Sequence, residues 1–174
     1  MTVLDDIEAS IPALRRYAHA LLRDRDRADD LVQDCLERAV AKRHLWRGDG
    51  PVQAWLFRIL INRHRDLYRA APAPGHLVAV EDLEMELAQP GGQEAHLALR
   101  DVQTAITRLP MDQREALLMV ALQGKTCDEA AAILDIPTGT LMSRLGRARA
   151  TLRVLTGRGD DTGRRAGRNR TIKP

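Results

Sequence analysis

Residues 126–153, TCDEAAAILDIPTGTLMSRLGRARATLR, are typical of a short helix, a tight turn and a second helix rich in arginine. Thr126 and Glu129 form an S/T-x-x-E capping box, so we expect the first helix to begin there. The turn D-I-P-T at 135–138 ends this helix, because Asp tolerates a positive φ and Pro removes a backbone donor. Thr138 is placed to cap the second helix. The stretch therefore predicts a helix-turn-helix.

The second helix of this pair is strongly basic. Apolar residues recur at spacings of three and four and predict one inward stripe: Leu141, Leu145, Ala148 and Leu152. No acidic residue lies between Pro137 and Arg153. Such a helix fits the DNA major groove, where Thr, Ser and Arg reach base edges and backbone amides meet phosphate. The side chains expected to contact DNA are Thr138, Thr140, Ser143, Arg144, Arg147, Arg149 and Arg153, the last two through phosphate. If this helix is considered alone, the alternative to a DNA-reading helix is a basic amphipathic helix on the protein surface.

Another helix with a polar arc is predicted in the first half of the chain. Asp49-Gly50-Pro51 is expected to start it, because a proline in the first turn loses only a donor that has no helical partner. One apolar face of this helix includes Leu56, Ile59 and Leu60. A second apolar stripe is formed by Phe57, Ile61 and Tyr68, so this helix should pack against more than one neighbour. At 100° per residue, four polar side chains fall within an arc of about 60° and are candidates for DNA contact: Arg58, Asn62, Arg65 and Arg69.

Two further helices are predicted upstream. The first is expected to start at Ser10 and Pro12, after which apolar residues recur at helical spacing. The second has an apolar face from Ala28 to Val40. Carboxylates lie on its other faces: Asp29, Asp30, Asp34 and Glu37. These acidic residues are either a solvated surface or a contact with another protein.

Three segments together resemble the extracytoplasmic-function (ECF) family of bacterial RNA polymerase sigma factors. They are P-T-G-T-L-M-S-R-L-G-R-A-R from Pro137, D-D-L-V-Q-D-C-L-E-R-A from Asp29, and W-L-F-R-I-L-I-N-R-H-R-D-L-Y-R from Trp55. The resemblance covers roughly residues 11–70 and 94–155, in the order and spacing of the family. It implies an all-α protein with two small helical domains joined by a flexible linker, the second containing the helix-turn-helix.

The resemblance also implies a role for each part. The acidic helix would dock on the coiled coil of the largest subunit of core RNA polymerase, and the helix from Thr138 to Arg153 would hold the minus-thirty-five promoter element. The melted minus-ten element would be held by Arg47, Asp49, Arg58, Asn62, Arg65 and Arg69, with a base captured at the loop 47–51. Most family members are kept inactive by an anti-sigma factor, so we expect that partner too. Met142 stands where the family often has Lys or Arg, so one phosphate contact is expected to be missing.

The charge and composition of the chain limit where the protein can lie in the cell and how it can bind nucleic acid. The net charge is +3, but residues 157–174 hold six basic and two acidic residues, a net of +4, so the other 156 residues sum to −1. Basic residues of the folded part must therefore be concentrated if it binds nucleic acid. No apolar run approaches the roughly 18 residues of a membrane span, and the acidic start lacks the features of a signal peptide. We expect a cytoplasmic protein with no membrane insertion.

The chain divides into parts. All five aromatic residues lie in the first 68 positions, which predicts two separate cores. We expect domains at 1–70 and 94–156, a linker at 71–93 with a short helix around 80–87, and a disordered basic tail at 157–174. In the second domain, a capping box of Asp112 and Glu115 predicts another helix, which ends before Gly124.

No cofactor, metal or catalytic site is indicated. Cys35 and Cys127 have no metal-ligand spacing and are expected to be partly buried in helices. No nucleophile, base and orienting acid can be paired, so an enzyme is not expected. Two functional alternatives to a sigma factor stay open: a sigma-like mimic that sequesters an anti-sigma factor, and a plain helix-turn-helix regulator. The first domain argues against the regulator, and the retained arginine faces argue against the mimic.

Overall fold

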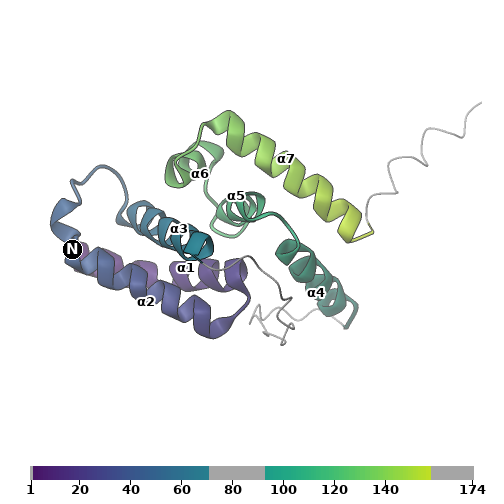
Figure 1. Cartoon of the computed structure of the whole chain (residues 1–174), viewed down its shortest axis with the longest axis horizontal. Helices are drawn as coiled ribbons and strands as arrows, with labels where there is room; N and C mark the ends of the chain where they lie inside the picture. Colours follow the sequence, from purple (N-terminus) through teal and green to yellow (C-terminus); the bar gives the residue numbers. More distant parts are fainter. Residues whose placement is uncertain (1, 71–92, 158–174) are drawn as a thin grey trace, which may run out of the picture.

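The computed structural model describes residues 2–70 and 93–157 of the chain (Figure 1). Within this part it is all-helical, with no strand, which confirms the predicted fold class. The helices are α1 (Val3–Leu22), α2 (Arg25–Ala41), α3 (Val52–Ala70), α4 (Gln93–Thr107), α5 (Met111–Ala121), α6 (Cys127–Leu134) and α7 (Thr138–Leu155), with a 3₁₀ turn, η1 (Arg43–Leu45). The short helix predicted around 80–87 and the tail beyond Gly157 lie outside the described residues.

Helices α1, α2 and α3 pack on one another and form what we call the N-terminal group. Their shared interior holds fully buried leucines and an aromatic pair, in which the rings of Tyr17 and Phe57 meet edge to face with centroids 5.4 Å apart. An aromatic pair of this geometry adds about 0.5–1.5 kcal/mol beyond the area it buries. As predicted, α3 contacts several neighbours: α1, α2 and α6. Of its second apolar stripe, however, only Phe57 and Ile61 are buried, whereas Tyr68 is 55% exposed.

The first helix starts earlier than predicted. Thr2 and Asp5 form a capping box, in which the Thr2 amide donates to Asp5 Oδ2 (2.6 Å) and the Asp5 amide donates to Thr2 Oγ1 (3.3 Å). Ser10 and Pro12 therefore lie inside α1, and their assignment as its start is wrong. Proline removes one backbone donor there, while the Ser10 hydroxyl donates to the Asp6 carbonyl at 2.7 Å. The apolar side of α1 is buried from Ile7 onward, so packing extends the helix across the proline.

Helices α4 to α7 form the C-terminal group, which contains the predicted helix-turn-helix. The capping box of Thr126 and Glu129 is present, with the Glu129 amide donating to Thr126 Oγ1 (3.2 Å) and the Thr126 amide to Glu129 Oε2 (2.8 Å). Asp135 takes the expected left-handed conformation (φ 55°). Thr138 does not cap α7, because Pro137 holds the cap position and the Thr138 hydroxyl donates to Asp128 Oδ1 at 3.0 Å.

The helix α5 also begins differently from the prediction. Its cap residue is Pro110, with no side-chain cap, and Asp112 accepts a hydrogen bond from the neighbouring Gln113 amide (2.9 Å) and pairs with Arg144 of α7 instead of capping the helix. Glu115 makes no capping bond because its carboxylate points into the contact between the two groups of helices. The helix ends at Ala121, slightly before the predicted end directly ahead of Gly124, and Gly124 adopts φ +63° beyond the last turn.

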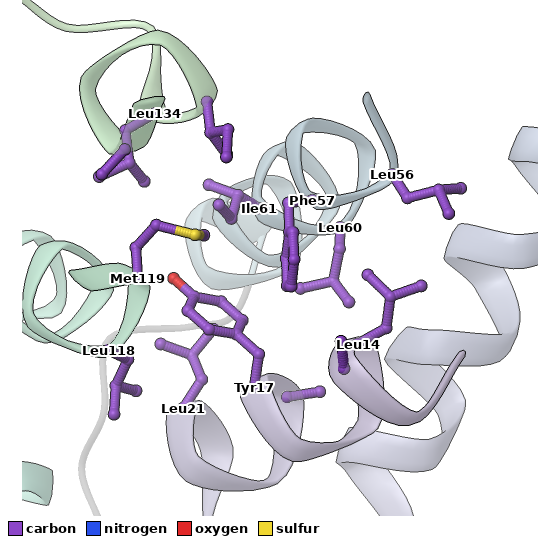
Figure 2. Packing of buried hydrophobic residues seen from close by; sticks show 14 of the residues in the cluster. Leu14, Tyr17, Leu21, Leu56, Phe57, Leu60, Ile61, Leu118, Met119 and Leu134 are labelled. Atoms are coloured by element: carbon purple, nitrogen blue, oxygen red, sulfur yellow. The ribbon is translucent and has the colours of Figure 1, made fainter. Parts of the chain in front are cut away.

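The two groups share one continuous core, where the sequence predicts two. Helix α5 lies against α1, and α6 lies against α3. Met119 and Leu118 of α5 approach Tyr17 and Leu21 of α1, while Leu134 of α6 faces Ile61 (Figure 2). The C-terminal group has no aromatic residue of its own, and in this structure it packs on aromatic residues of the N-terminal group. No helix in the described part is long and apolar enough to cross a membrane.

Candidate nucleic-acid interface

One face of α7 is open to solvent and basic. Leu141, Leu145 and Ala148 are buried, so this helix packs through its apolar stripe on α5 and α6. The opposite side faces outward on the edge of the molecule (Figure 1). Four predicted DNA contacts of α7 are exposed, Ser143 and Arg147 opposite the buried stripe and Arg149 and Arg153 on one flank of it. Thr138 and Thr140 are half-buried near the start of the helix. This exposed set is called the α7 basic face below.

Arg144 is placed differently from its neighbours on α7. Its Nε lies 3.4 Å from Oδ2 of Asp112 on α5, and only 19% of its side chain is exposed. Asp112 itself is 44% exposed, so the pair sits at the rim of the helix-turn-helix. Arg144 could reach a base edge only after leaving this carboxylate. Asp112 therefore competes with DNA for Arg144, and the spacing of residues along α7 does not predict this competition.

The arc of polar residues on α3 divides into two parts. Asn62 and Arg69 are exposed, and Arg69 forms an ion pair with Asp66 of the same helix (3.2 Å). Arg58, which is also exposed, and Arg65, which is half-buried, bond to the C-terminal group. Arg58 donates to the carbonyl of Ala132 at 2.8 Å, and Arg65 donates to the carbonyl of Leu134 at 3.3 Å. Both acceptors lie at the carboxyl end of α6.

Glu115 joins the two groups of helices. It is completely buried, and its Oε2 accepts two bonds from Arg65, at 3.1 Å from Nε and 2.8 Å from Nη2. Its Oε1 lies 3.3 Å from Nδ1 of the buried His64. Its backbone carbonyl accepts a bond from the Tyr17 hydroxyl at 3.1 Å. Burial, followed by the nearby Glu115 charge, raises the pKa of Tyr17 well above its usual value, so this hydroxyl keeps its proton.

The loop before α3 is exposed as the base-capture hypothesis requires. Arg47 and Asp49 are both exposed, and the chain turns at two glycines in left-handed conformations, Gly48 (φ +80°) and Gly50 (φ +96°). The Gly50 amide donates to the Gly48 carbonyl at 3.0 Å. Helix α3 begins directly after Pro51, whose carbonyl accepts the first bonds of the helix. Positive φ at both glycines explains why this tight loop uses that residue type.

The acidic face of α2 is only partly free. Asp30 and Glu37 are exposed, but Asp29 bonds to His19 (3.1 Å) and Arg15 (3.2 Å) on α1. The hydrogen bond from His19 and the nearby Arg15 charge lower the pKa of Asp29, although partial burial opposes them. Asp34 lies between two arginines, Arg38 at 2.8 Å and Arg63, so half of the predicted polymerase-binding set also holds the N-terminal group together.

Sequence reasoning missed several residues that organise this surface. Arg114 has no predicted role, yet it donates to the carbonyls of Ile106, Thr107 and Leu109 at the end of α4 and to Leu21 of α1. Glu115 was assigned to a local cap. The one available signal was its position directly before the apolar run A-L-L-M-V, where a carboxylate needs a buried partner. Within the described residues, no three His, Cys, Asp or Glu side chains gather as metal ligands would.

These features define an all-helical protein in which a helix-turn-helix with an exposed, arginine-rich second helix packs against another basic helix, α3. Residues 7–61 match the family described as the sigma2 domain of PhyR, and residues 99–152 match the family described as sigma-70, region 4. The ECF RNA polymerase sigma factor EcfG of Rhodopseudomonas palustris (strain TIE-1) is 42% identical over 87% of this chain and 83% of its own length.

Solved structures give the same result. The sigma factor RpoE from Bartonella quintana, in complex with the anti-sigma factor NepR, matches with a TM-score of 0.73 and 34% identity, over 88% of this chain and 95% of that one. CnrH in complex with the cytosolic domain of CnrY matches with a TM-score of 0.61 and 31% identity, over 84% of this chain and 81% of that one. The chain belongs to the ECF family of RNA polymerase sigma factors.

Proposed function

We propose that this sigma factor joins core RNA polymerase and positions it on a promoter through two DNA contacts. The α7 basic face holds the minus-thirty-five element in the major groove, and the polar arc of α3 with the loop 47–51 holds the melted minus-ten element. Polymerase supplies the chemistry, and we expect no catalytic activity from this chain itself. Because polymerase and chromosome share the bacterial cytoplasm, we expect the protein there.

The observation that supports this proposal most directly is the open α7 basic face. Its apolar stripe is buried, so Ser143, Arg147 and Arg149 are held outward on a helix that follows a capped partner helix and a tight turn. A helix presented in this way can enter the major groove without rearrangement of its own fold. We assign residues 94–156 to this domain, residues 1–70 to the polymerase and minus-ten domain, and residues 71–93 to the linker.

The acidic face of α2 is the proposed polymerase contact. Asp30 and Glu37 are exposed and available for intermolecular ion pairs, although Glu37 also accepts a bond from Gln33 Nε2 (3.1 Å), while Asp29 and Asp34 are held by arginines and a histidine of the N-terminal group. Exposed charges of this kind steer association and set its salt dependence more than they add affinity. We therefore expect Asp30 and Glu37 to contribute most to core binding.

An anti-sigma factor is the proposed regulator. RpoE of Bartonella quintana was solved with the anti-sigma factor NepR, and CnrH with the cytosolic domain of CnrY. By likeness to these relatives, an anti-sigma protein that contacts both groups of helices would keep this chain from polymerase.

A second candidate is a sigma mimic, favoured by one observation. Residues 7–61 match the sigma2 domain of PhyR, and PhyR from Bartonella quintana is described as an anti-anti-sigma factor in complex with NepR. A mimic would bind the anti-sigma factor but would have no need of the α7 basic face. A sigma factor would therefore support transcription by core polymerase, whereas a mimic would not.

The deciding experiment is run-off transcription with purified bacterial core polymerase, the full chain and a library of random promoter-length duplexes. We expect enrichment of two motifs separated by a constant spacer. The double substitution Arg147→Ala and Arg149→Ala should abolish enrichment of the upstream motif, whereas Arg16→Ala, an exposed arginine of α1, should not. Folded protein that binds an anti-sigma factor yet gives no core-dependent start would favour the mimic; duplex binding without core would favour a plain regulator.

A further inference from the structure

The C-terminal group covers part of the proposed minus-ten surface. Arg58 and Arg65, two of the four arc residues on α3, bond to α5 and α6; Arg58 stays exposed like Asn62 and Arg69, but its guanidinium is held by the Ala132 carbonyl. Only 22% of the Arg65 side chain is accessible. A DNA strand laid along the arc would have to displace these contacts.

We propose that this is a closed, self-inhibited conformation, in which α5 and α6 occupy arginines that the melted promoter strand needs. The inhibition rests on the proposed function of α3. In the open form, the two groups of helices separate, Arg65 becomes exposed, Arg58 loses its carbonyl partner, and the complete arc can bind single-stranded DNA. Free protein exchanges between the two forms, and promoter DNA draws it to the open one.

Glu115 is the latch of the closed form. Its buried carboxylate pairs with Arg65 and lies beside His64, and its carbonyl accepts the Tyr17 bond, so one residue of α5 contacts both α1 and α3. Removing a carboxylate and a guanidinium from water costs nearly as much as their attraction returns. The ion pair therefore sets the geometry of closure, while the apolar contacts of α5 with α1 and of α6 with α3 supply the attraction between the two groups. Loss of the Glu115 charge leaves Arg65 without its partner in the closed form, and this favours opening.

The carboxyl end of α6 provides the second contact. The carbonyls of Ala132 and Leu134 lie in its last turn, where the helix dipole favours cations, and each accepts a bond from an arginine of α3. These acceptors present the same type of partner to a guanidinium as a DNA phosphate does. A single DNA strand and the carboxyl end of α6 therefore compete for the side chains of Arg58 and Arg65.

The closed form leaves the upstream contact open. The residues of the α7 basic face are exposed, and α7 packs on other helices of the C-terminal group, away from α3 (Figure 1). Closure should accordingly weaken binding of single strands while leaving binding of duplex DNA unchanged. This difference separates self-inhibition from a general loss of charge or of folding.

The test uses the full chain with Glu115→Gln, which keeps the side-chain shape and removes the charge of the latch. Asp135→Asn is the matched control, because it makes the same charge change at an exposed position where Asn also tolerates the left-handed conformation. Small-angle X-ray scattering measures opening. Fluorescence anisotropy measures binding of labelled oligo(dT) and of a random-sequence duplex of the same length.

We expect Glu115→Gln to increase the radius of gyration and to bind oligo(dT) about tenfold more tightly, since a protein that is about 90% closed loses about tenfold in affinity. Its duplex affinity and all properties of Asp135→Asn should match the parent. If Glu115→Gln misfolds by circular dichroism, Tyr17→Phe, which removes only the interhelix hydroxyl bond, should shift both readouts in the same direction.

Unchanged scattering and unchanged oligo(dT) binding in a folded latch variant would overturn the proposal. Opening without tighter oligo(dT) binding would overturn the inhibition, because it would show that Arg58 and Arg65, once released from α5 and α6, do not hold single strands. Neither probe contains a promoter or requires polymerase. Failure of the sigma function would appear separately, as the absence of core-dependent starts from parent and variant alike.

Discussion

Arg144→Ala offers a direct test of base reading by α7. A bidentate contact between arginine and guanine is worth about 1–3 kcal/mol of discrimination against other base pairs. In the free protein this guanidinium lies 3.4 Å from Asp112, whose side chain is 44% exposed. An exposed ion pair contributes about 0–1 kcal/mol, so a base contact is the stronger of the two. DNA should therefore draw Arg144 away from Asp112.

From these magnitudes, Arg144→Ala should lower the ratio of specific to non-specific affinity by about 5- to 150-fold, the equivalent of about 1–3 kcal/mol. Asp112→Asn removes the competing carboxylate and should tighten specific binding, by about fivefold at most. Arg153→Ala, at an exposed position near the end of α7, should weaken all duplexes equally and reduce the salt dependence by about one charge.

The assay is fluorescence anisotropy at several salt concentrations, with a duplex containing the upstream motif from the run-off selection and a scrambled duplex. Equal losses on both duplexes for Arg144→Ala would refute base reading and leave Arg144 as a phosphate contact. Weaker specific binding after Asp112→Asn would refute the competition, because it would mean that Asp112 holds Arg144 in its DNA-bound position.

Three further outcomes are expected. Phe57→Ala removes a fully buried ring and should cost about 3–5 kcal/mol, lowering the melting temperature by roughly 10 °C in a thermal scan. Burial raises the pKa of Cys35 to about 12, so about 1 thiol in 10⁴ is ionised at pH 8; Ellman's reagent should react with Cys127 first and with Cys35 only on unfolding. Asp30→Ala should weaken core polymerase binding in a titration without changing the melting temperature, whereas Asp34→Ala should lower that temperature by breaking its ion pairs.

Local signals predicted the helix-turn-helix well. The capping box at Thr126, the left-handed Asp135 and the apolar stripe of α7 all act within a few residues, and each is present as predicted. The start of α1 was wrong because a serine followed by a proline is a common helix start. Here the Thr2 cap lies eight positions before Ser10, and burial of the apolar side of α1 outweighs the one bond that Pro12 removes.

The division of the α3 arc could not be predicted from its periodicity. Helical geometry places Arg58, Asn62, Arg65 and Arg69 on one side, but it does not show what else approaches that side. The acceptors of Arg58 and Arg65 lie 74 and 69 residues further along the chain, in a helix whose own sequence contains no sign of the contact. Backbone carbonyls at a helix end have no sequence signature, because every residue has one.

Glu115 shows that a residue can fit a local capping pattern in the sequence and yet make a long-range contact in the structure. An acidic residue three positions after Asp112 fits a capping box, and that interpretation gives the carboxylate a partner without any long-range contact. In the structure Pro110 starts α5 without a side-chain cap. The carboxylate is instead buried against Arg65 and His64, where an unpaired charge would be far more costly than a missing cap. If the closed form opens as proposed, Glu115 becomes hydrated and this constraint disappears.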